Sequence, residues 1–320
     1  FFRARKYKIY IMTQKNIETA VEVKNITKSY PGVTANDSVD FKVLKGEIHA
    51  LVGENGAGKS TLVKILYGIE QPDSGEIFIN DKPVEINKVD KAIELGIGMV
   101  HQEFHLVPSF TAAENIGLGQ EPRNSRGFID WDELNSEVSN IAKKYGLDVD
   151  PKLRMIDASV GIQQRTEILK TLYRNANILI LDEPTAVLTP QESRTLFKTL
   201  RQLLNDGLSI IFISHKLAEV LEVSDRIAVL RDGKLVLEEN VSETSEKMLA
   251  KAMVGRSFKM PIRKETTVGE SLLALENVSV STPERVGVLD RASFSVNSRE
   301  VVGLAGISGN GQSILADVIN

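Results

Sequence analysis

A glycine-rich segment that ends in a lysine, a serine and a threonine follows a short apolar run early in this chain. The apolar run covers residues 47–52, and residues 53–61 read Gly-Glu-Asn-Gly-Ala-Gly-Lys-Ser-Thr. This order fits the pattern G-x-x-x-x-G-K-[ST], which holds phosphate groups between a strand and a helix. Residues 61–66 have a helical pattern, so the N-terminus of that helix would add its dipole to the anion site. The sequence therefore predicts binding of a nucleoside triphosphate rather than an ordinary glycine-rich turn.

Each residue type in this segment has a physical role at the phosphates. Glycine at positions 53, 56 and 58 lets backbone N–H groups turn inward, in conformations that a Cβ would resist. Lys59 supplies a positive charge to the β- and γ-phosphates, and we expect the Ser60 hydroxyl to bind Mg²⁺. The predicted nucleotide-binding residues of the segment are Gly53, Glu54, Asn55, Gly56, Ala57, Gly58, Lys59, Ser60 and Thr61.

Two adjacent carboxylates end another apolar run later in the chain. Residues 178–181 are Ile-Leu-Ile-Leu, and Asp182 and Glu183 follow directly. A carboxylate at the C-terminal end of a parallel strand beside a phosphate loop is placed to hold Mg²⁺, so we expect Asp182 to bind the metal through water. Glu183 can polarise a water molecule towards the γ-phosphate. The alternative, in which both carboxylates only cap the next helix, is disfavoured by the phosphate loop.

The composition limits the kinds of protein that this chain can be. It has 320 residues, of which 42% are hydrophobic and 26% are charged, as in a soluble globular protein. The net charge of −4 argues against nucleic acid as the main partner. Cysteine is absent, so disulfides, thiol catalysis and cysteine metal sites play no part. No apolar run approaches the ~18 residues of a membrane helix, so we expect any membrane role to be peripheral.

The first 15 residues differ from the rest because they are basic and aromatic and lack an initiating Met. We expect residues 1–15 to be a non-native or disordered extension, with Met12 as the natural start. A membrane-surface anchor is the alternative.

Short apolar strands alternate with helical stretches in the body of the chain, which is typical of an α/β domain with a mostly parallel sheet. Period-two alternation at 21–23 and 39–43 predicts an antiparallel edge, which residues 77–80 continue. The runs 178–181 and 210–213 are too short for helices and apolar on both faces, so they predict central parallel strands.

The segment from Glu103 to about Arg174 has a mostly helical pattern, apart from a polar stretch at 120–126. Thr111 and Glu114 form a capping-box pattern that predicts the start of a helix. Residues 231–234, Arg-Asp-Gly-Lys, lie between two apolar runs and predict a hairpin.

A polar segment with Pro and Gly, residues 256–271, predicts a linker. Three segments after it repeat earlier ones: 275–279 repeats 23–27, 289–296 repeats 35–43, and 299–306 repeats 45–53. A repeat over roughly 250 residues fits two tandem domains rather than a solenoid. We therefore expect a first domain over residues 16–255 and the N-terminal fragment of a second, degenerate copy over residues 272–320.

Taken with these motifs, residues 20–320 resemble the ATP-binding subunits of ABC transporters. Tyr30 is similar to the aromatic residue that stacks on adenine in this family. Gln102 is similar to the glutamine that reaches Mg²⁺ or water and also the membrane partner, and His215 to the histidine that contacts the γ-phosphate. The other histidines, at positions 49, 101 and 105, lack a metal-ligand pattern and are expected to be structural or surface residues.

Three segments depart from the usual form of this family. The signature Leu-Ser-Gly-Gly-Gln is replaced by Ala-Ser-Val-Gly-Ile at 158–162, in which Ser159 and Gly161 remain as expected nucleotide contacts. The loop after Glu183 ends in Thr189 instead of an aspartate, and the second phosphate loop has Gln312 where lysine is expected. These features resemble the tandem ATP-binding subunits of bacterial simple-sugar importers, and most closely their nucleoside-importing branch.

The resemblance implies a P-loop ATPase fold with an antiparallel β subdomain and a helical subdomain. It implies ATP hydrolysis that drives import of a nucleoside or simple sugar, with ATP and Mg²⁺ as cofactors, at the cytoplasmic face of the membrane. The implied partners are permease subunits, a substrate-binding lipoprotein acting indirectly, and a second ATPase domain in cis or in a dimer. A soluble tandem ATPase acting on the ribosome or DNA and a regulatory ATP sensor are the alternatives.

Overall fold

The computed structural model describes residues 18–255, 267–281, 287–306 and 310–320. The chain divides into two compact units, Phe1–Phe258 and Lys259–Asn320, which are described separately below. The expected extension 1–15 and most of the expected linker lie outside the described residues. The first described strand after that linker begins at Ser271.

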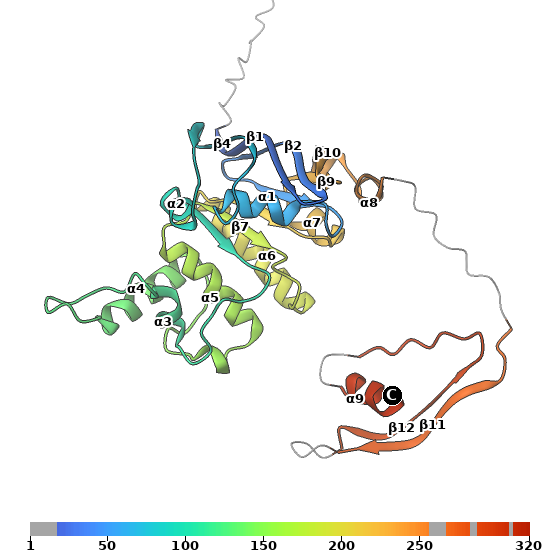
Figure 1. Cartoon of the computed structure of the whole chain (residues 1–320). Coiled ribbons are helices and arrows are strands. Elements are labelled where there is room, and N and C mark those ends of the chain that lie inside the picture. The colour runs from blue at the N-terminus through green and yellow to red at the C-terminus, as the bar shows by residue number, and fades with distance from the viewer. Residues whose placement is uncertain (1–17, 256–266, 282–286, 307–309) are drawn as a thin grey trace, which may run out of the picture. The chain divides into compact units, whose positions relative to one another are not determined.

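A six-stranded sheet forms the centre of the first unit (Figure 1). Its strand order is β10-β9-β3-β8-β7-β6, and all neighbours are parallel except β9 and β10. The strands are β3 (Ile48–Val52), β6 (Ile97–Val100), β7 (Ile178–Asp182), β8 (Ser209–Ile213), β9 (Arg226–Arg231) and β10 (Lys234–Asn240). The mostly parallel core sheet, its two central apolar strands and the hairpin at 231–234 were all predicted correctly.

Both faces of this sheet are buried, which explains why its central strands are apolar at every position. In β7, Leu179 and Leu181 belong to one core cluster, whereas Ile178 and Ile180 belong to the other. Side chains alternate between the two faces of a strand, so an uninterrupted apolar run serves two cores at once. The sheet therefore separates two hydrophobic layers of the same unit.

One layer lies between the central sheet and a second, antiparallel sheet. The strands of this second sheet, in the order β2-β1-β4-β5, are β2 (Val33–Leu44), β1 (Thr19–Tyr30), β4 (Ser74–Ile79) and β5 (Lys82–Val84). Helix α1 (Lys59–Leu66) contributes its apolar residues to the core cluster that both sheets share. The expected antiparallel β subdomain is thus confirmed, and α1 is fixed from both sides.

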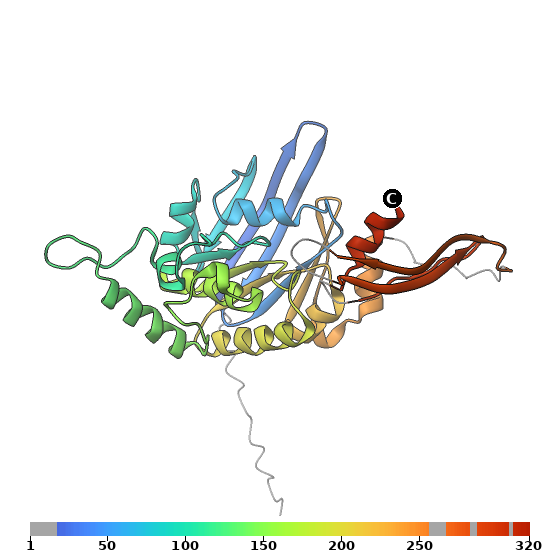
Figure 2. The ribbon, with the colours of Figure 1, turned by 90° about the horizontal axis from the view of Figure 1, so that it is seen from below.

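The remaining helices cover the other face or flank the sheets. They are α2 (Val89–Glu94), α3 (Ala112–Gly117), α4 (Trp131–Lys144), α5 (Val160–Tyr173), α6 (Pro190–Asn205), α7 (Leu217–Val223) and α8 (Glu246–Val254), with one-turn 3₁₀ helices at Met155–Asp157 and Val241–Glu243. Helices α3, α4 and α5 form the expected helical subdomain. Both views show the connection between α3 and α4 extending away from the central sheet (Figures 1 and 2).

The predicted capping box at the start of α3 is present in full. The Glu114 N–H donates to Thr111 Oγ1 at 3.2 Å, and the Thr111 N–H donates to Glu114 Oε2 at 2.7 Å. Within the described residues, no helix is both long and apolar enough to cross a membrane.

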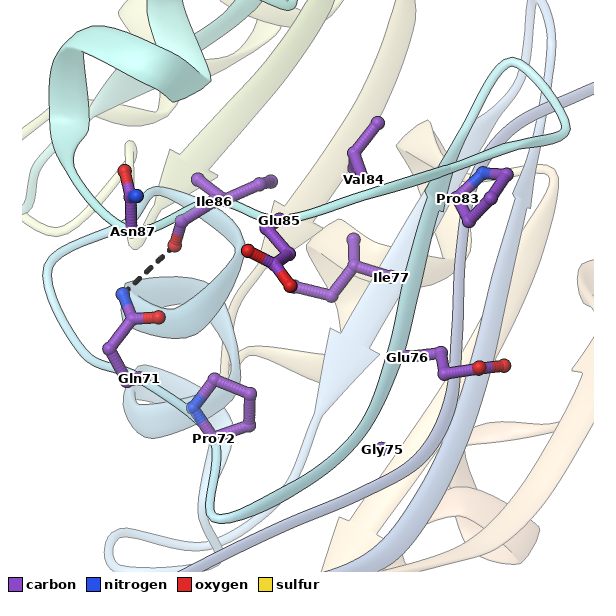
Figure 3. A pocket seen from close by; sticks show the side chains of 10 residues that line it. All are labelled: Gln71, Pro72, Gly75, Glu76, Ile77, Pro83, Val84, Glu85, Ile86 and Asn87. Carbon is purple, nitrogen blue, oxygen red and sulfur yellow. Dashed lines mark hydrogen bonds between the residues drawn. The ribbon is translucent and has the colours of Figure 1, made fainter.

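A hollow of about 650 Å³ lies beside β4 and β5 (Figure 3). It is lined by residues 71–72, 75–77 and 83–87. The Gln71 side-chain amide donates to the Ile86 carbonyl at 2.9 Å. Gln71 follows the C-terminal end of α1, whereas the glycine-rich segment precedes its N-terminal end. A helix of 8 residues is about 12 Å long, so this hollow and the phosphate loop lie at opposite ends of α1.

The second unit repeats local details of the first. Strands β11 (Ser271–Val280) and β12 (Leu289–Asn297) pair antiparallel, and α9 (Gln312–Ile319) follows. Asn25 in β1 and Asn277 in β11 both have φ 52°, although neither is glycine. Gly58, which precedes α1, and Gly311, which precedes α9, both adopt a left-handed conformation, with φ 104° and 94°. The internal repeat of the sequence is therefore also a repeat of backbone conformation.

Candidate functional site

The glycine-rich segment connects β3 to α1. Two neighbouring carbonyl groups leave no room for a side chain at two of its glycines. A Cβ on Gly58 would lie 2.1 Å from the Ala35 carbonyl oxygen, and one on Gly53 would lie 2.3 Å from that of Leu230. Gly56 and Gly58 have φ values of +83° and +104°. Side chains are therefore excluded sterically at Gly53 and Gly58 and conformationally at Gly56 and Gly58.

Lys59 is the first residue of α1, and its side chain folds back over the loop. Its ammonium donates to the Gly53 carbonyl at 2.8 Å and to the Glu54 carbonyl at 3.0 Å. The residue is only 7% exposed. Burial lowers the pKa of Lys59, and the nearby carboxylates of Glu183 and Asp182 oppose that change. The segment thus holds a largely buried cation at the N-terminus of a helix, where anions are favoured.

Two carboxylates lie at the C-terminal end of β7, near this lysine. Burial, and then the charge of Glu183, raise the pKa of Asp182, while Lys59 lowers it. Glu183 adopts φ 47°, which is unusual for a residue other than glycine, and its N–H donates to the Ile213 carbonyl at 3.0 Å. That bond fixes the end of β7 to the end of β8, the neighbouring parallel strand.

His215 follows β8 and reaches the same carboxylate. Its Nδ1 lies 2.9 Å from Glu183 Oε1. The side chain of His215 is 51% exposed and that of Glu183 only 17%. A histidine and a glutamate that come from the ends of two different strands are therefore joined in one hydrogen-bonded pair beside Lys59.

The other predicted site residues lie at different places. Gln102 is exposed and follows β6, which pairs in parallel with β7, so it belongs to the same edge of the sheet. Tyr30 is half-exposed at the end of β1, and the Lys28 ammonium lies 5.7 Å from the centre of its ring.

Ser159 is the N-cap of α5, and Gly161 lies in its first turn. Both line a cavity of about 100 Å³ with residues of α6, and none of the lining residues belongs to the phosphate loop. The structure therefore places them away from the group formed by Lys59, Asp182, Glu183 and His215.

The three histidines outside the site have different surroundings. His49 is fully buried, with Nδ1 2.9 Å from the Lys42 carbonyl oxygen. The rings of His101 and His105 pack with centroids 4.6 Å apart. Among the described residues, no group of three or more His, Asp or Glu side chains is arranged to hold a metal ion.

Sequence reasoning missed Asn36 and Glu192, and it noted Thr189 only as a departure from the family pattern. Asn36 is buried, and its side-chain amide donates to the Gly58 carbonyl at 3.2 Å. Nothing in the local sequence indicates this contact, because the two residues meet only through the packing of β2 on α1. Glu192 and Thr189 form a second capping box at the start of α6, and its pattern T-x-x-E was readable in the sequence.

The arrangement of loop, lysine and paired carboxylates on a mostly parallel sheet defines a P-loop ATPase domain of the ABC type. Comparison with known proteins agrees with this assignment. Residues 36–186 match the family model described as ABC transporter. The chain is 48% identical to the guanosine import ATP-binding protein NupO of Bacillus subtilis over 95% of its own length and 59% of that protein's. It is 44% identical to the ribose import ATP-binding protein RbsA 1 of Rubrobacter xylanophilus, over 93% and 59%.

Solved structures give the same fold. The protein cbiO1 of Clostridium perfringens, part of an ABC transporter complex, matches with a TM-score of 0.62 at 28% identity, over 71% of this chain and 90% of that one. A dimeric post-hydrolysis state of an ATP-binding cassette with ADP and Pi matches with a TM-score of 0.59 at 28% identity, over 69% and 98%. The chain carries a domain of the ABC transporter family, as its motifs predicted. It spans about three-fifths of the length of the curated relatives that it matches.

Proposed function

We propose that this chain binds and hydrolyses ATP in order to drive import of a nucleoside or a simple sugar through a separate membrane permease. The observation that carries the proposal is the position of Lys59 at the N-terminus of α1, beside the carboxylates of Asp182 and Glu183. A buried cation, a helix N-terminus and two carboxylates at the end of one parallel sheet suit a nucleotide phosphate with its metal ion.

The phosphate contacts follow from the loop geometry. Backbone N–H groups of residues 53–61 would surround the β- and γ-phosphates, and Lys59 would exchange its present carbonyl partners for phosphate oxygens. Because those carbonyl bonds already hold the ammonium over the loop, little rearrangement is needed. Tyr30, half-exposed at the end of β1, is proposed to stack on the adenine.

The donors for Mg²⁺ are all oxygen atoms, which suits this hard cation. Ser60 is exposed in the first turn of α1, and burial together with the charge of Glu183 raises the pKa of Asp182, which a bound cation would oppose. We propose that Ser60, Gln102 and Asp182, the last through water, hold the ion. The bound ion would neutralise charge on the phosphates.

Glu183 is proposed as the group that polarises the attacking water. Its bond to His215 orients the carboxylate, and its backbone is fixed to β8 through Ile213. The side chain of His215 is half-exposed and is proposed to contact the γ-phosphate. Ser159 and Gly161, which lie away from this group, would contact the nucleotide held by a second ATPase domain, in cis or in a dimer.

The direction of transport and the partners are proposed from the relatives. Those compared above are a guanosine importer subunit and a ribose importer subunit. We therefore propose permease subunits as direct partners, a substrate-binding lipoprotein as an indirect one, and a peripheral position on the cytoplasmic face of the membrane. No nucleic-acid partner is expected.

The proposal is tested by uptake into vesicles that contain the complete transporter, with labelled guanosine and labelled ribose as alternative cargoes. Uptake that requires ATP hydrolysis supports import. ATP turnover that is unaffected by any permease and stimulated by ribosomes or DNA would instead support the soluble alternative, and ATP binding without turnover would support a sensor. A polytopic permease gene next to this one is the simplest independent check.

A further inference from the structure

The loop between Glu183 and α6, residues 184–189, is held at its start by α5 and at its end by the first turn of α6. At its start, the side-chain amide of Gln164 donates to the carbonyl of Pro184, and Gln164 is only 2% exposed. At its end, Glu192 of α6 accepts from the N–H of Thr189 at 2.9 Å and from its hydroxyl at 2.8 Å. Helix α5 is the helix that begins at the Ser159–Gly161 turn.

The two oxygens of Glu192 face different elements. Oε2 accepts both bonds from Thr189, whereas Oε1 lies 3.0 Å from the position that a Cβ on Gly161 would occupy. Hydrogen bonds from Thr189 lower the pKa of Glu192, and smaller contributions in the same direction come from Arg165 and the Gly161 N–H. One carboxylate thus lies between the N-termini of α5 and α6, and both termini favour a negative charge.

The N-terminus of α5 lacks a side-chain cap of its own, so a carboxylate from another element can stabilise it. Ser159 is its N-cap, but the Ser159 side chain makes no capping bond. The first turn of a helix contains backbone N–H groups without partners inside the helix. A hydroxyl that does not cap its own helix remains available to a ligand, and Glu192 lies where it can satisfy part of the terminus in its place.

We propose that Glu192 is a positioning residue that links the Ser159–Gly161 turn to loop 184–189, and so to Glu183. The proposal rests on the proposed ATPase function and extends it. When the Ser159–Gly161 turn engages a nucleotide, Glu192 and Gln164 carry its displacement to the two ends of the loop. The loop begins directly after Glu183, so one domain's turn and its own water-polarising carboxylate move together.

The chain itself offers a matched control. Thr111 and Glu114 form the same reciprocal capping box at the start of α3, with comparable distances. Replacing Glu114 by alanine removes a helix cap but touches neither Gly161 nor loop 184–189. Glu192→Ala removes an equivalent cap together with the proposed link. Glu192→Gln keeps an oxygen for the box but removes the charge, and serves as the milder variant.

Hydrogen exchange of the full chain tests the link itself, without requiring any ATP turnover. We expect Glu192→Ala to speed exchange both in residues 184–189 and in the first turn of α5, whereas Glu114→Ala changes neither. Gly161→Ala places a methyl group against Oε1 and should produce the same pattern from the other side. The double variant Glu192→Ala/Gly161→Ala should speed hydrogen exchange no more than either single variant, because both substitutions disrupt the same contact. Additive effects, or faster exchange in α6 alone, would refute the link.

ATP turnover by the complete transporter tests the role of Glu192 in catalysis. We expect Glu192→Ala to lower kcat for ATP about tenfold with KM nearly unchanged, Glu192→Gln to lie between it and the wild type, and Glu114→Ala to leave kcat unaffected. A kcat for Glu192→Ala equal to that of Glu114→Ala, at similar thermal midpoints, would leave Glu192 as a helix cap only. A wild-type protein without turnover would instead overturn the proposed function, while the exchange data still decide the link.

Discussion

Replacing Lys59 by alanine is the most direct test of the phosphate site. The ammonium lies over the loop, 2.8 Å and 3.0 Å from the carbonyl oxygens of Gly53 and Glu54, and is largely buried. It is therefore pre-positioned for phosphate oxygens at the N-terminus of α1. A hydrogen bond between charged groups contributes about 1.5–3 kcal/mol, so its loss should weaken ATP binding roughly 10- to 150-fold.

The assay is calorimetric titration of the full chain with MgATP, together with transport by the complete system. Lys64→Ala is the matched control, because Lys64 lies in the last turn of the same helix and is exposed. We expect the control to bind ATP as the wild type does, and Lys59→Ala to abolish nucleotide-dependent transport.

The result that would refute this reasoning is a Lys59→Ala variant that is folded and binds MgATP within about twofold of the wild type. The loss of a buried, charge-assisted contact cannot be that small if the phosphates lie at the loop. Such a result would mean that the nucleotide binds elsewhere on the chain.

Three further predictions follow from the same geometry. Glu183→Gln should bind ATP normally but stop turnover, because the amide cannot polarise water; turnover at the normal rate would point to Asp182 or His215. Asp182→Asn should stabilise the nucleotide-free chain at pH 7, because burial and the charge of Glu183 raise the folded-state pKa of Asp182, so that the free energy of unfolding falls as pH rises above the ordinary Asp value; a difference in thermal midpoint that stays flat across pH 4–7 would contradict this. The two composite ATP sites proposed for a pair of tandem domains should be unequal, because Gln312 stands where the second loop's lysine is expected; equal turnover at the two sites would refute this.

Local sequence patterns predicted much of the fold because the physical constraint was local. The run at 178–181 must be apolar on both faces, and the structure assigns alternate residues to two cores. The capping boxes depend on residues only three positions apart. The phosphate loop depends on glycines whose neighbours, Ala35 and Leu230, are far away in sequence, but the requirement for glycine remains visible in the motif itself.

The contacts that sequence reasoning could not predict are those between elements that meet only after folding. Asn36 and Gly58 are joined because β2 packs against the start of α1, and no periodicity in either segment indicates that contact. The pairing of His215 with Glu183 follows from the parallel register in which Asp182 lies beside Ile213. The sequence allows the inference that Glu183 and His215, at the ends of neighbouring strands, lie close together. It does not indicate which nitrogen of the histidine would face the carboxylate.

The threonine in place of aspartate at position 189 shows how a departure from a family pattern acquires a physical meaning. In the sequence alone, Thr189 stands where the family usually has an aspartate, so a carboxylate is missing from that position. In the structure, a carboxylate lies at the same loop end, supplied three residues later by Glu192, and it is held by both the N–H and the hydroxyl of Thr189. An aspartate at position 189 would place a second negative charge beside Glu192, and like charges at such a distance repel. Threonine is therefore the residue that allows Glu192 to lie against Gly161, and Thr189→Asp should weaken that contact rather than restore a missing function.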